Sequence, residues 1–155
     1  MSKTFLHKIF GFGKIPKRMR PAIEQEGIVL IDEGIGGWIK FMNFRAPGRR
    51  YSLKYSWFTG AIVLTNKRFA AFTFYPFFNP IINVPLDAEY LNKLQCSLKE
   101  ETTLCVLFDH SDFHEDWSGT IECRFSTPQA RLFLEQIKNK HKIRNPKQEI
   151  RNNIE

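Results

Sequence analysis

Three arginines surround the Pro47-Gly48 pair, a dipeptide that favours a tight turn between two strands. A guanidinium group binds phosphate through two parallel hydrogen bonds, whereas a lysine ammonium adds a compact point charge. The candidate anion-binding residues are Arg45, Arg49, Arg50 and Lys54. A basic turn that is simply solvated is the alternative interpretation of the same pattern.

The segment 109–116 combines two imidazoles, those of His110 and His114, with four carboxylates. Such groups can hold a metal, and imidazoles among carboxylates can also make a pH-sensitive hairpin. A helix would bring positions four apart together, but this segment joins two expected strands. We therefore expect a solvated acidic hairpin and no metal site.

The sequence contains no pattern that indicates a disulfide framework, a zinc site or a catalytic site. Cys96, Cys105 and Cys123 form neither an even disulfide set nor a paired zinc pattern, so we expect reduced strand residues. Nucleophile, metalloprotease, phosphate-loop and dinucleotide motifs are absent from the sequence. We expect a protein that is not an enzyme and uses no cofactor.

Charge is segregated along the 155 residues, which carry a net charge of +7. Residues 1–20 contain six bases and no acid, and residues 34–86 contain seven bases and no acid. Residues 87–136 contain ten acids against four bases. If neighbouring strands pair, these blocks form a basic pole and an opposite acidic pole, with the arginine turn in the basic one.

Most of the chain shows strand periodicity. Tyr51, Leu53, Tyr55 and Trp57 alternate with polar residues, which predicts a strand whose apolar face is buried. Residues 27–45 contain glycines that allow either one bent strand or two. About seven strands are expected in a barrel or sandwich, over residues 27–45, 51–57 running on into 61–65, 69–75, 81–86, 91–98, 102–109 and 118–125.

Helical patterns occur at the two ends. The segment 126–129 reads Ser-Thr-Pro-Gln, a helix start, and is followed by the apolar stripe Ala130, Phe133, Leu134 and Ile137. Near the N-terminus, Phe5, Ile9 and Phe10 belong to a short helix candidate before a basic linker. That candidate either packs on the domain or inserts its apolar side chains among lipid headgroups.

The phrase Leu64-Thr65-Asn66-Lys67-Arg68, between two apolar runs, resembles the hairpin of the GRAM and bacterial pleckstrin-homology-like (PH-like) domains. The resemblance implies a mainly β fold, a PH-like seven-stranded antiparallel barrel capped by a C-terminal amphipathic α-helix. A short N-terminal helical extension would precede it. We divide the chain into a basic N-terminal extension (1–23), a PH-like domain (24–142) and a basic C-terminal tail (143–155).

The resemblance also implies a binding module. We expect it to dock on an anionic membrane surface or phospholipid headgroup through its basic pole, with the N-terminal segment assisting. No apolar run of spanning length or signal peptide is visible, so a cytoplasmic protein with peripheral membrane association is expected. The alternatives are a protein-interaction adaptor using an exposed strand edge, and a single-stranded nucleic-acid binder using Phe77 and Phe78.

Overall fold

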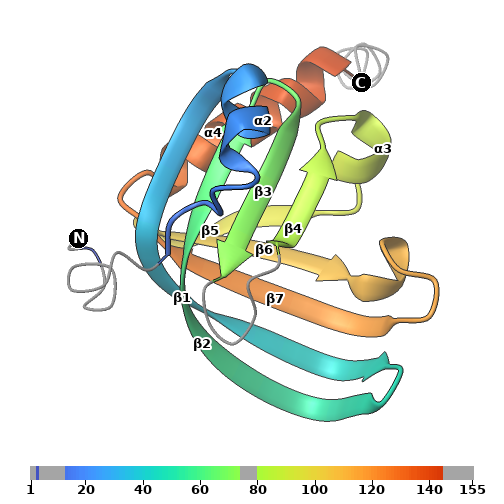
Figure 1. Cartoon of the computed structure of the whole chain (residues 1–155). Helices are drawn as coiled ribbons and strands as arrows, with labels where there is room; N and C mark the ends of the chain where they lie inside the picture. The colour runs from blue at the N-terminus through green and yellow to red at the C-terminus, as the bar shows by residue number, and fades with distance from the viewer. Residues whose placement is uncertain (1–2, 4–12, 74–79, 145–155) are drawn as a thin grey trace.

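The computed structural model describes residues 3, 13–73 and 80–144 and shows one curled antiparallel sheet with helices on two sides (Figure 1). This arrangement confirms the predicted fold class. The elements in chain order are α2 (Arg20–Gln25), β1 (Ile28–Ala46), β2 (Arg49–Thr65), β3 (Arg68–Thr73), β4 (Pro80–Pro85), α3 (Ala88–Leu91), β5 (Gln95–Glu100), β6 (Thr103–Asp109), the 3₁₀ helix η1 (His110–Asp112), β7 (Ser118–Ser126) and α4 (Ala130–Arg144).

The seven strands lie in the order β4-β3-β2-β1-β7-β6-β5, and β4 and β5 are the two edges. Because these edges are not paired with each other, the sheet is a half-barrel. Of the predicted range 27–45, all residues except Gly27 belong to one strand, β1, whose pairing with β2 shifts between Glu33 and Ile35. Close backbone approach requires a glycine on β2, since a Cβ on Gly60 would lie 2.0 Å from the carbonyl oxygen of Phe72.

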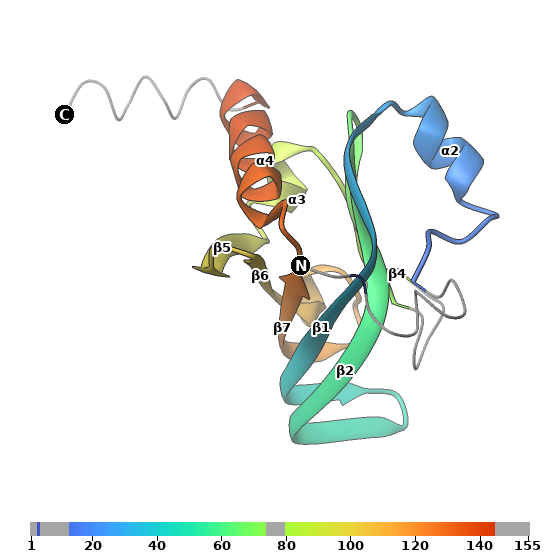
Figure 2. The same cartoon turned by 90° about the vertical axis from the view of Figure 1, so that its left-hand side faces the viewer.

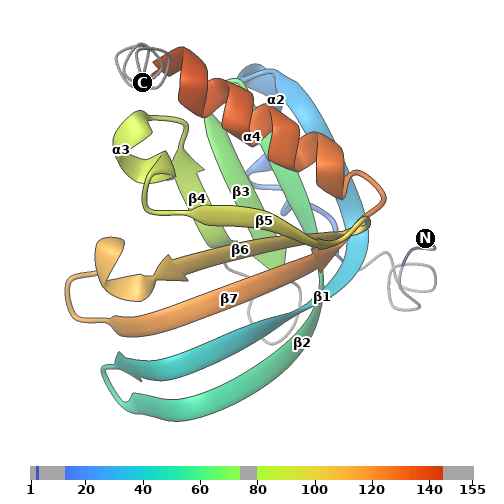
Figure 3. The ribbon, with the colours of Figure 1, turned by 180° about the vertical axis from the view of Figure 1, so that it is seen from behind.

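The main core fills the concave side of the sheet, and α4 covers one end of it (Figure 3). Ala130, Phe133 and Ile137 are buried there, as the helical stripe predicts, and the Phe133 ring packs against Phe69 at a centroid distance of 6.5 Å. The backbone N–H of Gln129 donates to Thr127 Oγ1 (3.1 Å), while its side-chain amide donates to the carbonyl oxygen of Ile31 (3.0 Å). The glutamine thus ties the helix start to β1.

A second, smaller core lies on the convex side of the sheet. Ile15 and Ile23 pack there against Ala61, Val63 and Phe72, so α2 and α4 lie on opposite faces of the long β1–β2 hairpin (Figure 2). The segment predicted as a basic linker is therefore docked and leads into the short helix α2. The predicted helix with Phe5, Ile9 and Phe10 lies outside the described residues.

The strand predicted over residues 91–98 is only partly correct. Ala88–Leu91 forms the short helix α3, and the strand begins later, at Gln95. Asp87 has extended backbone, and its carbonyl oxygen accepts the N–H of Leu91 (2.9 Å), which places Leu91 in the core. Helix-forming residues after an extended aspartate favour this turn over strand pairing.

The turn between β2 and β3 has a structural role. Thr65 Oγ1 accepts the backbone N–H groups of Lys67 (3.1 Å) and Arg68 (3.0 Å) and donates its hydroxyl to Glu26 Oε2 (2.8 Å). Arg68 forms a two-point ion pair with the same carboxylate, with Nε 2.9 Å from Oε2. The Thr65–Arg68 polar groups therefore fasten the turn to the end of α2.

This contact makes stability depend on pH. Burial raises the pKa of Glu26, but hydrogen bonds from Arg68 and Thr65, with the charges of Arg68 and Lys67, outweigh it and leave the pKa below its usual value. A lowered folded-state pKa stabilises the protein above the unfolded-state pKa, and this stabilisation is lost as the pH falls through the folded-state pKa.

We expect Glu26→Gln to lower the free energy of unfolding by about 2 kcal/mol at pH 7, because the charge-assisted hydrogen bonds are lost. The difference in unfolding free energy between this variant and the wild type should shrink as the pH falls below about 4, because the Glu26 carboxyl of the wild type then becomes protonated. Urea unfolding at pH 7 and pH 3 measures both values. Glu24→Gln, on the exposed side of the same helix, is the control and should change stability by less than about 0.5 kcal/mol. An equal loss at both pH values would contradict the assignment.

Candidate functional site

The turn between β1 and β2 lies at the end of the molecule away from α4 in all three views (Figures 1, 2 and 3). Pro47 and Gly48 form it, and Gly48 has the positive φ of +74° that such a turn uses. The structure brings the four predicted anion-binding residues together around this turn, and all are exposed. We call them the basic hairpin tip: Arg45, Arg49, Arg50 and Lys54.

Within the basic hairpin tip, two like charges face each other. Arg45 and Arg50 are direct cross-strand partners, and like charges in such a pair destabilise a hairpin. Aromatic packing underneath offsets this cost: the rings of Phe44 and Tyr51 stack at 5.9 Å, and the Lys54 ammonium lies 4.3 Å from the Tyr51 ring centroid. The basic hairpin tip is thus a cluster of cations held in place by aromatic packing. A bound anion would lower the electrostatic repulsion between these cations.

The prediction of a buried apolar face on residues 51–57 is wrong. Tyr51 is half-buried, but on the convex side of β2 Leu53 is 58% exposed, Tyr55 52% and Trp57 72%. We call these three residues the outer apolar row.

The described part of the N-terminal segment covers the convex face of β2 only as far as Thr59. Ala61 and Val63 continue the same face of β2 and are buried under Ile15 and Ile23. Gly13 crosses β2 at Thr59, where a Cβ on this glycine would meet the threonine methyl at 2.8 Å. A period of two indicates which residues share a face, but it does not indicate which face a neighbouring segment covers.

Aromatic rings and cations continue from the outer apolar row across the convex face. Trp38 on β1 is the direct partner of Trp57 and has Arg124 of β7 on its other side. The Arg124 guanidinium carbon lies 4.5 Å from the Trp38 ring centroid, and its Nη2 lies 3.5 Å from Glu122 Oε1. Beside them is a shallow hollow of about 370 Å³ lined by Gly36, Trp38, Trp57 and Arg124 among others. Sequence periodicity did not reveal this site, because it depends on pairing across three strands.

The acidic segment 109–116 lies beside the basic hairpin tip, and the expectation of opposite poles fails here. Arg45 pairs with Ser118, the first residue of β7, and Trp117 packs edge-on against Phe44 at 5.9 Å. Adjacent pairing of β1 with β7, which are far apart in sequence, brings the two charge blocks together.

The two histidines of this segment sit in an aromatic cluster. The His110 ring lies 4.9 Å from His114 and 4.6 Å from Trp117, and its Nδ1 is buried without a hydrogen-bond partner among the described residues. Burial lowers the pKa of His110 and His114 lowers it further, while Asp109 opposes the change. Ser111 hydrogen bonds lower the pKa of Asp109. No group of three metal-ligating side chains occurs in the part of the chain that the structure describes.

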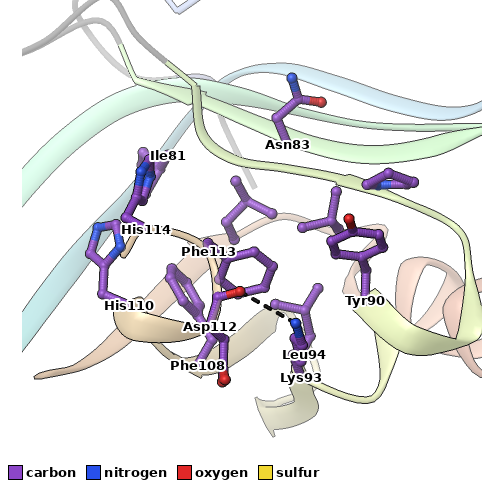
Figure 4. A pocket seen from close by; sticks show the side chains of 13 residues that line it. Ile81, Asn83, Tyr90, Lys93, Leu94, Phe108, His110, Asp112, Phe113 and His114 are labelled. Atoms are coloured by element: carbon purple, nitrogen blue, oxygen red, sulfur yellow. Dashed lines mark hydrogen bonds between the residues drawn. The ribbon is translucent and has the colours of Figure 1, made fainter. Parts of the chain in front are cut away.

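A second concavity lies between β4 and η1 (Figure 4). It has a volume of about 570 Å³ and is lined by residues of β4, α3, β6 and η1 and the turns beside them. Lys93 donates across it to the carbonyl oxygen of Asp112 (3.4 Å), as the dashed line in Figure 4 marks.

All three cysteines are free thiols on adjacent strands. Burial raises the pKa of Cys96 to about 12 and raises the pKa values of Cys105 and Cys123 as well. The Cys105 Sγ lies 3.6 Å from Glu122 Oε1, which also opposes thiolate formation. Thiols held protonated in this way are poor nucleophiles and metal ligands.

Among the described residues, no helix combines the length and apolar character needed to cross a membrane. A scan against protein-family models and a search of curated proteins found no match to this chain.

Proposed function

We propose that this protein is a non-catalytic PH-like binding module that docks on an anionic membrane surface or phospholipid headgroup. The observation that carries the proposal is the exposed outer apolar row on the same projecting hairpin as the basic hairpin tip. Aromatic residues beside cations suit the membrane interface, where rings enter the headgroup region and cations meet lipid phosphates.

The two sets of residues have separate tasks in this proposal. The basic hairpin tip attracts the surface over roughly a Debye length, and the attraction weakens as salt is added. The outer apolar row then contributes burial of apolar area, which salt does not screen. The acidic segment 109–116 lies beside the tip, so we infer that docking presents the convex face of β2 and turns the segment away from the lipid.

We expect Leu53→Ser to weaken binding to anionic vesicles about tenfold, because burying half of a leucine side chain is worth about 1.4 kcal/mol. Co-sedimentation with vesicles containing phosphatidylserine measures the change. Leu132→Ser is the matched control, since Leu132 on α4 is 49% exposed and lies far from the hairpin turn. Equal affinities for the two variants would contradict the assignment of the apolar row.

Single-stranded nucleic acid is a second candidate ligand, favoured by one observation. Trp38 and Tyr55 each have a cation over the ring, from Arg124 at 4.5 Å and Lys40 at 5.7 Å, and stacking rings beside cations also bind unpaired bases. Phe77 and Phe78, the residues predicted for this role, lie outside the described residues. Salt-sensitive retardation of an oligonucleotide that Trp57→Ala abolishes would support this candidate over the membrane.

A further inference from the structure

The groove between β4 and η1 exists because the sheet does not close. β4 is an edge strand, paired with β3 on one side only, and Pro80 and Pro85 at its ends limit further pairing. On the other side of the groove, β6 leads into η1, while α3 and the turn after it close one end. The groove is therefore framed by β4, α3, β6 and η1.

The lining of the groove is mixed: apolar side chains alternate with polar ones, among them Asn83, Asp112 and His114. Ile82, Val84 and Phe108 belong to the main core and present their surfaces to the groove from below. Leu94 is also a buried core residue, and the half-buried Ile81 and Phe113 complete the apolar part of the lining. A volume of about 570 Å³ with this lining is in the range of small-molecule sites.

The polar groups of the groove are placed at its rim. Figure 4 shows Lys93 and Tyr90 at one end, and His110 and His114 with Ile81 at the other. The Lys93 ammonium lies 5.4 Å from the Tyr90 ring centroid and donates to the Asp112 carbonyl oxygen at the long distance of 3.4 Å. No carboxylate of the described part of the chain forms an ion pair with Lys93.

We propose that this groove binds a fatty acid, with the hydrocarbon tail along β4 and the carboxylate at Lys93. The tail would cover the exposed parts of the half-buried Ile81 and Phe113, and the carboxylate would give the ammonium a charge-assisted hydrogen bond in place of a weak one. This inference goes beyond membrane docking and uses none of the residues of the hairpin.

The test is calorimetric titration of the wild-type protein with saturated fatty acids of increasing chain length. Each added methylene should raise the affinity about fourfold, which corresponds to about 0.8 kcal/mol, until the groove is full. Laurate should bind more tightly than dodecanol, and this preference should disappear in Lys93→Met but persist in Lys99→Met, which removes an exposed lysine of β5. Affinities that do not change with chain length would overturn the proposal.

A second measurement locates the ligand. Ile81→Trp narrows the groove and should weaken laurate binding at least tenfold, whereas Ile28→Trp, at an exposed isoleucine elsewhere, should not. In the wild-type protein, a fatty acid with a spin label on its tail should broaden the methyl NMR signals of Ile82 and Val84 more strongly than that of Leu132, in the first turn of α4. Equal broadening at these positions would overturn the site without relying on any variant.

A third ligand shows whether the bound hydrocarbon tail belongs to a free fatty acid or to a phospholipid. Lauroyl lysophosphatidylcholine has the same tail as laurate but a bulky zwitterionic head. Tighter binding of laurate supports a free acid as the ligand, whereas equal binding would overturn the role of Lys93. Ile81→Trp should leave vesicle docking unchanged, so the groove and the hairpin are tested separately.

Discussion

Reversing two charges of the basic hairpin tip, Arg49→Glu with Arg50→Glu, should weaken binding to anionic vesicles by about a thousandfold. Each basic residue near an anionic surface contributes about 1 kcal/mol, and replacing it by an acid adds a similar repulsion. Two reversals therefore change the binding free energy by about 4 kcal/mol. Co-sedimentation at low and physiological salt measures the loss, which should be smaller at higher salt.

The control for this variant makes the same change in net charge on a different part of the protein. Arg131→Glu with Lys138→Glu changes two exposed residues of α4 and lowers the net charge of +7 by the same amount. The fold should tolerate the hairpin variant, because a glutamate at position 50 would face Arg45 as an opposite charge. If the α4 variant loses as much binding as the hairpin variant, overall charge is responsible and the tip is not a site.

Phe133→Ala should lower the free energy of unfolding by about 3–5 kcal/mol, because it removes a fully buried ring between α4 and the sheet. The ring packs against Phe69, so its loss leaves a cavity at the covered end of the half-barrel. Urea unfolding followed by far-ultraviolet circular dichroism measures this change.

Leu132→Ala on the same helix is the comparison for Phe133→Ala. Leu132 is half exposed, and alanine is a good helix former, so this variant should lose less than about 1 kcal/mol. Similar losses for the two variants would mean that α4 is not held by its buried stripe.

The fold class could be predicted because its signals are local. The stripe Ala130, Phe133 and Ile137 has helical spacing, and each member is buried. The Thr65–Arg68 turn contains its own hydrogen-bonding groups, and Thr65 accepts two N–H groups from its own turn. Such signals depend on residues within a few positions of each other, so tertiary contacts did not have to be known.

The candidate site could be predicted only in part. Arg45 and Arg50 are close in sequence and were correctly placed beside one turn. The exposure of Trp57, its pairing with Trp38 and the position of Arg124 depend on contacts between segments distant in sequence. The groove beside β4 depends on how β4, α3 and η1 come together in the fold, which no local pattern specifies.

The central claim, that the β1–β2 hairpin enters an anionic membrane surface, is tested most directly with Trp57 as a fluorescent reporter. In a variant with Trp38→Phe and Trp117→Phe, Trp57 is the only tryptophan that remains. Adding vesicles of phosphatidylserine with brominated acyl chains should shift its emission to shorter wavelengths and quench it, while neutral vesicles should do neither. Unchanged Trp57 emission on anionic vesicles that do bind the protein would contradict the account.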